Sequence, residues 1–148
     1  MRSKIMPTTY LLALLLLSVG LHFVFPIKNI IHSPYNYLGI IFIVFGGTLN
    51  IWADRVFKKS NTTVKPHETP SSLEVTGPFC ISRHPMYLGM CAILLGEAII
   101  LGSIITFSIP ILFIILMEVI FIPYEDENLE EAFGEEYINY RKKVRRWI

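Results

Sequence analysis

Four apolar stretches constrain what this chain can fold into more than any other feature. A helix that crosses a bilayer needs roughly 20 mostly apolar residues. Four segments approach or reach that length, at about residues 5–25, 37–57, 85–101 and 104–124. Hydrophobic residues make up 53% of the chain, a share too high for an ordinary soluble domain. We therefore predict an all-α, polytopic membrane protein in which residues 1–148 form one domain, a bundle of about four helices.

The first apolar stretch has a second interpretation, as a signal peptide. It begins with Met-Arg-Ser-Lys and continues into a leucine-rich core, which is the pattern of a secretory leader. However, the apolar run is long, no clear small-x-small cleavage site follows it, and further spans come after it. A membrane span is therefore the favoured interpretation.

The uneven distribution of basic residues predicts the orientation of the chain. With four spans, twelve of the thirteen lysines and arginines fall on one side of the membrane, and only Lys28 falls on the other. The twelve are Arg2, Lys4, Arg55, Lys58, Lys59, Lys65, Arg83, Arg141, Lys142, Lys143, Arg145 and Arg146. The positive-inside rule makes their side cytosolic, so both termini, the 58–84 loop and the 125–148 segment are expected in the cytosol. A net charge of +1 gives no reason to expect a nucleic-acid partner.

The positions of histidine and cysteine predict no metal site. The four histidines, at positions 22, 32, 67 and 84, are scattered, and Cys80 and Cys91 stand in no metal-ligand pattern. Because these cysteines fall on the cytosolic loop and in a helix, we expect reduced thiols.

A basic pair directly precedes the third span, in the segment "GPFCISRHPMYLGM". Pro85 suits the first helical turn, where its missing N–H costs nothing, and it pushes His84 out of helical geometry. Arg83 and His84 are therefore expected in a loop at the positive end of the helix dipole. Tyr87 follows about half a turn later and faces the same mouth. Interface anchoring is the simpler explanation for basic residues at a span end.

Only Gly102 and Ser103 separate the third and fourth spans, which predicts a tight helical hairpin. The hairpin brings the basic pair to the same rim as Glu125, Asp126 and Glu127. A proline-rich loop and C-terminal helices are expected to roof this rim. It suits a ligand that carries a carboxylate, an ammonium and an apolar part, because cationic groups hold the carboxylate and acidic groups hold the ammonium.

Apolar residues recur every three or four positions after the fourth span. They are Leu129, Phe133, Tyr137, Tyr140, Val144 and Trp147. This spacing predicts an amphipathic helix, which Gly134 is expected to divide into two short helices. The acidic front and basic tail favour helices that lie at the cytosolic membrane surface. Packing and surface anchoring are the expected roles of the aromatic residues.

Two motifs stand on either side of the predicted hairpin. The first is "GPFCISRHPMYLG", and the second is "YEDENLEEAFGEEYINYRKKV", in which Asp126 takes the place of a second glutamate. Together they resemble the isoprenylcysteine carboxyl methyltransferase and phospholipid methyltransferase group of integral membrane enzymes. The resemblance covers roughly residues 55–146, and this chain looks like a compact prokaryotic member.

The resemblance implies a methyltransferase that depends on S-adenosylmethionine. It implies catalytic contributions from His84, Tyr87 and Glu125. It also implies cofactor contacts from those three residues and from Ser71, Ser72, Leu73, Glu74, Phe79, Arg83, Pro85 and Met86.

The implied reaction is a direct in-line displacement, for which the protein positions donor and acceptor and excludes water. A carboxylate acceptor needs no general base, whereas an amine needs one, and His84 and Glu125 are the candidates. The implied acceptor is lipophilic, isoprenylcysteine-like or phospholipid-like, and enters from the bilayer. Phe121 replaces an arginine that looks to face the substrate carboxylate in eukaryotic isoprenylcysteine enzymes, which disfavours a prenylcysteine.

Two other functions remain open from the sequence. One is an NADPH-dependent membrane reductase, because sterol reductases look distantly similar in the C-terminal part, and Lys58, Lys59 and Lys65 could meet phosphates. The other is a non-catalytic membrane scaffold or binding protein, against which the intact set of rim residues argues. Glu97 and Glu118 lie inside predicted spans, where acids are costly and commonly functional, and they are candidates for lining a lipid-side cavity.

Overall fold

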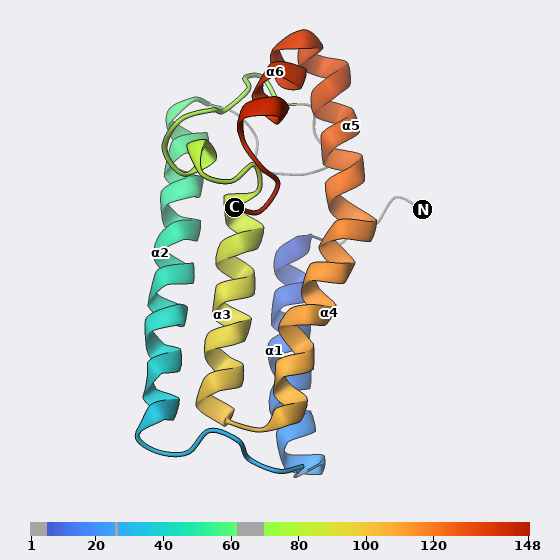
Figure 1. Cartoon of the computed structure of the whole chain (residues 1–148). Coiled ribbons are helices and arrows are strands. Elements are labelled where there is room, and N and C mark those ends of the chain that lie inside the picture. Colours follow the sequence, from blue (N-terminus) through green and yellow to red (C-terminus); the bar gives the residue numbers. More distant parts are fainter. Residues whose placement is uncertain (1–5, 26, 62–69) are drawn as a thin grey trace.

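The computed structural model describes residues 6–25, 27–61 and 70–148, and within those ranges the regular structure is helical, with no named strand. Figure 1 shows the main helices running alternately down and up along one axis. Their bounds are α1 Pro7–Val24, α2 Leu38–Lys59, α3 Pro85–Leu101, α4 Ser108–Leu116, α5 Ile122–Phe133 and α6 Glu135–Lys143. Short 3₁₀ turns occur at η1 Tyr35–Tyr37, η2 Gly77–Cys80 and η3 Ile104–Phe107, and a π-helical segment, η4, at Met117–Phe121.

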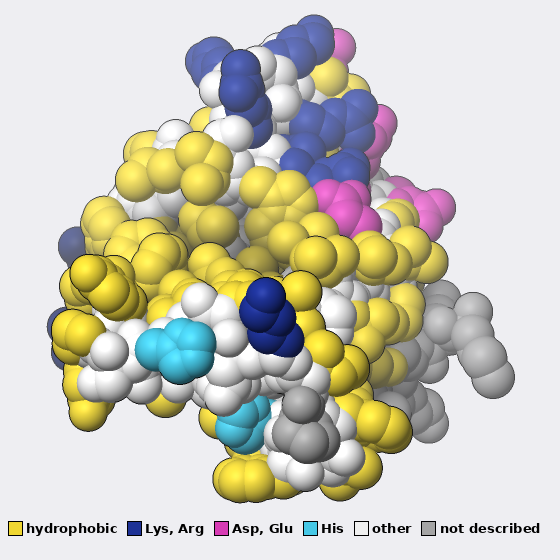
Figure 2. Space-filling view, turned by 60° about the horizontal axis from the view of Figure 1, so that its bottom comes forward, with side chains coloured by type: hydrophobic (Ala, Val, Ile, Leu, Met, Phe, Trp, Pro, Cys, Tyr) yellow, Lys and Arg dark blue, Asp and Glu magenta, His cyan; other side chains and the backbone are white. Residues whose placement is uncertain are grey.

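The lengths and composition of these helices fit a membrane protein. Three helical stretches of the described chain are long and apolar enough to cross a bilayer, namely Pro7–Val24, Tyr35–Lys59 and Ile104–Phe133. The apolar helix α3 is shorter, at 17 residues, and has the bounds predicted for the third span. Hydrophobic side chains cover the sides of the molecule, whereas most charged ones gather toward the top of the view in Figure 2. The predicted all-α, multi-pass architecture is therefore confirmed.

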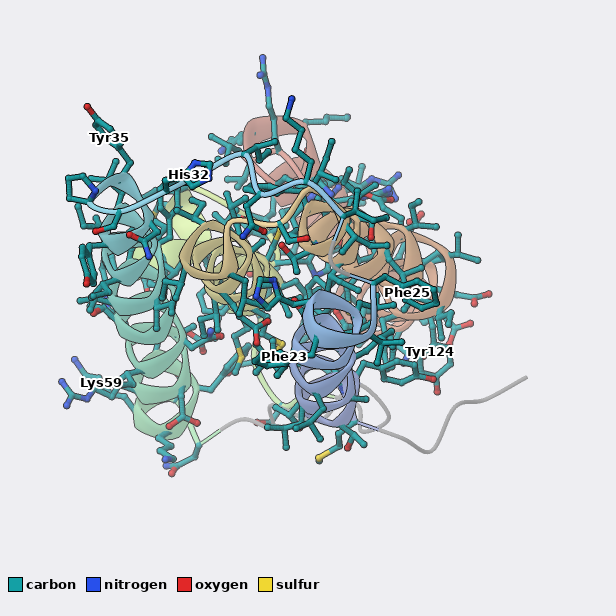
Figure 3. The ribbon with its side chains drawn as sticks, turned by 90° about the horizontal axis from the view of Figure 1, so that it is seen from below. Phe23, Phe25, His32, Tyr35, Lys59 and Tyr124 are labelled. Atoms are coloured by element: carbon teal, nitrogen blue, oxygen red, sulfur yellow. The ribbon has the colours of Figure 1, made fainter. Side chains whose placement is uncertain are left out.

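Helix α3 lies between α2 on one side and α1 and α4 on the other (Figures 1 and 3). A cluster of buried apolar side chains joins α3 to α1 and α4, and Leu94, Ile109, Phe113 and Met117 are each at most 2% exposed in it. Because α3 is covered from several sides, its first turn is held firmly by the rest of the bundle.

Glycines allow α2 and α3 to approach each other closely. A Cβ atom added to Gly39 would lie 2.2 Å from the carbonyl oxygen of Gly96, and one added to Gly46 would lie 2.3 Å from that of Gly89. Gly39 and Gly46 are seven residues apart on α2, as are Gly89 and Gly96 on α3. The two glycines of each helix therefore lie on the same face of that helix. Small residues of this kind let helix backbones meet in a membrane protein.

We expect Gly46→Ala and Gly47→Ala to have opposite effects on stability. An alanine methyl group at position 46 would clash with the backbone carbonyl of Gly89. Forced overpacking of this kind costs roughly 1–3 kcal/mol. A Cβ on Gly47 would meet no described atom within 4 Å, so alanine there is expected to be neutral or to stabilise the helix by up to about 1 kcal/mol. Unfolding by SDS in mixed micelles, followed by circular dichroism, measures both. Equal effects at the two positions would show that the close approach is absent.

The connection between α3 and α4 is as short as predicted. Gly102 has φ 69°, and a Cβ atom there would lie 2.3 Å from the carbonyl oxygen of Ile31, so only glycine fits. Its own carbonyl accepts hydrogen bonds from the amides of Ile30 at 2.8 Å and Ile31 at 3.3 Å. This tight turn lets the start of α3 meet the first turns of α5 at one end of the bundle, as the hairpin prediction requires.

The helical backbone does not stop near residue 124, where the fourth span was predicted to end. Instead, α4, the π-helical segment η4 and α5 form one continuous helix up to Phe133. Pro123 explains the π segment, because its ring would clash with the carbonyl four residues earlier, at Val119, and a wider turn relieves that clash.

The predicted break at Gly134 is confirmed. Gly134 has φ 53° and ψ −123°, a conformation that favours glycine. Helix α6 therefore turns back over the end of the bundle rather than extending α5 (Figure 1). The position of α5 and α6 relative to a membrane surface, and the cytosolic orientation, remain predictions. Of the basic residues on which that orientation rests, Arg2, Lys4 and Lys65 lie outside the described residues.

Candidate active site

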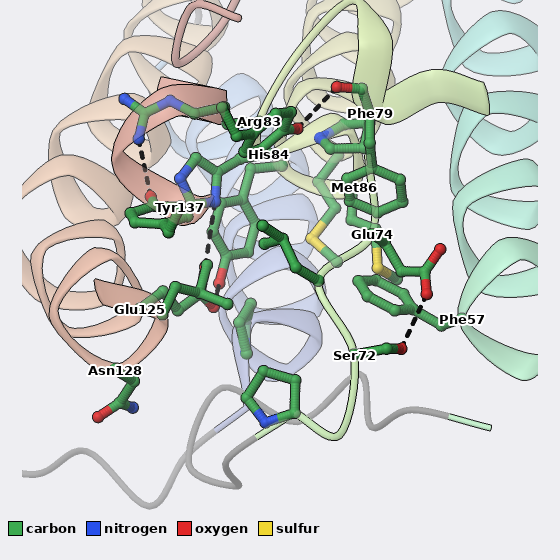
Figure 4. Close-up of a pocket in the computed structure, with 18 of the residues that line it drawn as sticks. Phe57, Ser72, Glu74, Phe79, Arg83, His84, Met86, Glu125, Asn128 and Tyr137 are labelled. Atoms are coloured by element: carbon green, nitrogen blue, oxygen red, sulfur yellow. Dashed lines mark hydrogen bonds and ion pairs between the residues drawn. The ribbon is translucent and has the colours of Figure 1, made fainter. Parts of the chain in front are cut away.

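A pocket lies at the end of the bundle where α3 begins, and five segments contribute to its wall (Figure 4). These are the start of α1, the end of α2, the loop before α3 with the first turns of α3, the middle of α5, and α6. The lining residues that concern the chemistry are Phe57, Ser72, Leu73, Glu74, Phe79, Arg83, His84, Pro85, Met86, Tyr87, Glu125, Asn128, Leu129, Tyr137 and Tyr140.

Pro85 sets the position of the basic pair as expected. It occupies the first turn of α3, and His84 before it has φ −124° and ψ 60°, outside helical geometry. The backbone amide of His84 donates a hydrogen bond to the hydroxyl of Ser82 at 3.2 Å. The loop therefore presents both basic side chains across the rim toward α5.

The carboxylate of Glu125 joins α5 to the start of α3. Its Oε1 accepts a hydrogen bond from the hydroxyl of Tyr87, and its Oε2 lies 3.1 Å from Nδ1 of His84. The rings of His84 and Tyr87 are stacked, with centroids 5.6 Å apart and an angle of 9° between planes. Glu125 is only 19% exposed, so these three residues, which are the predicted catalytic set, form one partly enclosed polar group.

Asp126 holds a second set of partners. Its Oδ1 lies 3.0 Å from Nη1 of Arg83 and 3.5 Å from Nε2 of His84. The hydroxyl of Tyr137 donates to the same oxygen and accepts a hydrogen bond from Arg83 at 2.8 Å. The side chains of Arg83 and Asp126 are 7% and 11% exposed, so their charges are compensated mainly by each other.

The electrostatics of the site favour a charged His84. Burial opposes protonation, but hydrogen bonds and negative charge from Asp126 and Glu125 outweigh it, so the pKa of His84 is raised above its ordinary value. Burial raises the pKa of the Tyr137 hydroxyl, and its hydrogen bond to Asp126 adds to that effect. Tyr137 therefore remains a hydrogen-bond donor to the carboxylate.

This raised pKa predicts a loss of stability as the pH rises. Because the folded state binds the His84 proton more tightly than the unfolded state does, protonation of His84 stabilises the fold. This stabilisation is complete below the ordinary histidine pKa of about 6.5, and it is lost as the pH rises through the raised pKa of His84. We expect His84→Gln to remove this part of the pH dependence of unfolding and His32→Gln, on the other connection, to retain it. SDS unfolding across that pH range tests the prediction, and an unchanged slope in His84→Gln contradicts it.

The structure brings together all of the predicted cofactor-binding residues except Ser71. The hydroxyl of Ser71 donates instead to the carbonyl of Asn61 at 3.2 Å, and Ser71 does not line the pocket. Ser72 does, and it donates to Oε1 of Glu74 at 3.0 Å. The rim was also expected to hold Glu127, but its side chain is exposed and it does not line the pocket.

Several lining residues were not predicted as parts of the site, among them Phe57, Asn128, Leu129, Tyr137 and Tyr140. Tyr137 and Tyr140 were assigned only to packing, and they are indeed buried in a cluster with Phe79. In addition, the Tyr140 hydroxyl donates to the Phe79 carbonyl at 2.6 Å. The amphipathic spacing of the C-terminal residues could have indicated this part of the site. An amphipathic helix buries its apolar face, and here the surface available for that is the end of the bundle that holds the pocket.

The remaining candidates do not line the pocket. Phe121, 2% exposed, packs edge-on against Tyr10 with centroids 5.4 Å apart. Neither Glu97 nor Glu118 lines the pocket. Within the described residues, no group of three His, Cys, Asp or Glu side chains is placed to hold a metal ion.

A helical membrane bundle with titratable side chains around a pocket at one end defines a candidate membrane enzyme. A family model described as phospholipid methyltransferase matches residues 34–136. Since this is more than half of the chain, the protein belongs to the phospholipid methyltransferase family, and membership implies a membrane methyltransferase. The chain is also similar to an uncharacterized protein of Haemophilus influenzae, with 40% identity over 63 residues, which are 43% of this chain and 100% of that relative.

Proposed function

We propose that the protein transfers a methyl group from S-adenosylmethionine to a lipophilic or lipid-type acceptor at the cytosolic face of the membrane. The observation that carries the proposal is the polar group of His84, Tyr87 and Glu125 at the mouth of a pocket whose other walls are largely apolar. Its place at the end of a membrane bundle suits a cofactor that arrives from water and an acceptor that arrives from lipid.

The donor set of the pocket fits this cofactor. Glu125 offers a carboxylate to an ammonium group. Arg83 lines the pocket, and its Nε is buried without a hydrogen-bond partner among the described residues, which leaves a donor for a carboxylate. Leu73, Phe79 and Met86 provide an apolar wall for the remainder. When bound, S-adenosylmethionine supplies an activated methyl group and its leaving group.

The residues of the chain then have three roles. Tyr87 and His84 orient the Glu125 carboxylate through the bonds described above. Tyr137 and Tyr140 close the pocket on the side of α6 and limit water. If the acceptor is an amine, it has to lose a proton, and either His84 or Glu125 lies at the site to receive it.

The acceptor class follows from the membrane setting. The pocket lies beside helices that expose large apolar side chains, such as Leu16 at 76% and Val119 at 71%, so a lipid can approach along them. Phe121, at the position of the arginine noted above, is buried against aromatic rings and offers no charge to an acceptor carboxylate. These features support a phospholipid-like acceptor over a prenylcysteine.

A labelled-methyl assay tests the proposal. Purified protein in mild detergent is incubated with methyl-labelled S-adenosylmethionine and a total membrane lipid extract, and the lipid phase is analysed by mass spectrometry. We expect label in the lipid phase with the wild-type chain and none with Glu125→Ala. Absence of labelled lipid, with intact cofactor binding, would overturn the acceptor class.

The reductase interpretation finds less support in the structure. Neither Lys58 nor Lys59 lines the described pocket, and Lys65 lies outside the described residues. Lys58 instead forms an exposed ion pair with Asp54, at 2.6 Å. The basic side chains that NADPH phosphates would need are therefore not gathered in the described part of the site.

A further inference from the structure

The chain continues past α6 and returns to the pocket. After Lys143 it runs down from α6 and ends beside the start of α3 (Figure 1). Along this path the carbonyl of Arg145 accepts a hydrogen bond from the amide of Arg83 at 3.0 Å. The carbonyl of Arg146 accepts one from the hydroxyl of Ser82, also at 3.0 Å. The last residues are thus attached to the loop that carries the basic pair.

The side chains of Arg146 and Trp147 reach η4 and α5. Nη1 of Arg146 lies 2.6 Å from Oε2 of Glu118, and Nη2 lies 3.3 Å from Oδ2 of Asp126. The indole N–H of Trp147 donates to Oε1 of Glu118 at 2.6 Å. Both carboxylate oxygens of Glu118 are therefore held by the C-terminal residues. This gives a role to an intramembrane acid that the pocket itself does not use.

We propose that Arg146 and Trp147 are positioning residues for the active site. Together with Glu118 they form what we call the C-terminal clamp, which fastens the loop of Arg83 and His84 to the fourth helix. Arg146 also contacts the Asp126 carboxylate, which forms an ion pair with Arg83 and lies close to His84. Its effect on cofactor affinity rests on the function proposed above.

Two observations separate the clamp from an ordinary surface contact. Glu118 lies in the π-helical segment, and such segments occur frequently at functional sites because they redirect the side chains that follow, here Glu125 and Asp126. The family match ends at residue 136, so Arg146 and Trp147 lie beyond the matched region, whereas Glu118 lies within it. The Arg141–Glu130 pair, at 2.8 Å, is 42% and 43% exposed, which is close to the 40% of Arg146 and the 31% of Glu118, but Arg146 also contacts the buried Asp126 carboxylate, whereas Arg141 pairs only with Glu130 among the described residues. This pair provides a matched control.

Hydrogen exchange tests the clamp without any ligand. The Arg83 amide, bonded to Arg145, is expected to exchange roughly ten times faster in Arg146→Ala, because loss of a local contact raises the population of the open form. Arg141→Ala is expected to leave that rate unchanged. Circular dichroism confirms that both variants are folded. Equal exchange at Arg83 in wild type and Arg146→Ala would overturn the clamp.

Cofactor titration tests its consequence. We expect Arg146→Ala to raise the Kd for S-adenosylmethionine by about tenfold, and Arg146→Lys, which keeps the charge but not the two-armed contact, to fall between it and wild type. A double mutant with Glu118→Gln should show non-additive effects on Kd, because the two residues act as a pair. Faster exchange with an unchanged Kd would overturn the positioning role. Failure of the wild-type chain to bind the cofactor would overturn the proposed function, and exchange at Arg83 would still decide the clamp.

Discussion

Replacing Asp126 with asparagine is expected to destabilise the protein by about 3–5 kcal/mol, the usual cost of removing one partner from a buried ion pair. The amide keeps the shape of the side chain but loses its charge. Arg83, 7% exposed and 3.0 Å from Asp126, would then be buried without its counter-charge. Tyr137 and Arg146 would also lose the anion to which they are bonded. SDS unfolding in mixed micelles measures the effect.

Glu130→Gln is the matched control for this change. It removes an acid from the same helix, one turn later, but Glu130 pairs with Arg141 at the surface. Exposed ion pairs contribute roughly 0–1 kcal/mol, so we expect little change in its free energy of unfolding. If Asp126→Asn were as stable as Glu130→Gln, the pair between Arg83 and Asp126 would not hold the loop to α5.

The second large effect is expected at Glu125. Glu125→Gln keeps the size of the side chain but removes the charge that we assign to the cofactor ammonium. We expect the Kd for S-adenosylmethionine to rise about 100-fold, which corresponds to roughly 2.7 kcal/mol and is in the range of a charge-assisted hydrogen bond. Isothermal titration calorimetry in detergent provides the measurement.

Two further variants separate the charge of Glu125 from its surroundings. Tyr87→Phe removes the hydroxyl that bonds to Glu125 but keeps the ring that stacks on His84, so we expect a smaller loss, of roughly tenfold in Kd. Glu127→Gln neutralises an exposed acid two residues away and should leave Kd unchanged. Equal losses at positions 125 and 127 would indicate a general effect of negative charge and contradict the assignment.

The elements that sequence predicted best are those fixed by residues with strict backbone requirements. Pro85 can begin a helix but cannot sit within one without strain, and α3 begins there. Gly134 divides the C-terminal helices because other residues disfavour its conformation. The helix of the fourth span continues past the predicted end for a related reason. Charged residues after Tyr124 mark a change in polarity, but they are compatible with a helix, which therefore continues to the next residue that stops it.

The predicted rim was found because opposite charges lay at the two ends of one helical hairpin. The partners within it could not be predicted, since they depend on the π segment, which shifts the angular position of every residue after Phe121. The loop residues Ser71 and Ser72 have no periodic pattern that would show which of them faces the pocket. The place of the C-terminal residues beside Arg83 is likewise a tertiary contact without a local signal.

Titration of the wild-type protein with S-adenosylmethionine, with NADPH as the parallel ligand, tests the central claim most directly. The protein is purified in mild detergent, and calorimetry reports binding without knowledge of the acceptor. Saturable binding of S-adenosylmethionine, without binding of NADPH, is the result that we predict. Binding of NADPH instead, or of neither ligand by a folded sample, would contradict the assignment of this pocket to methyl transfer.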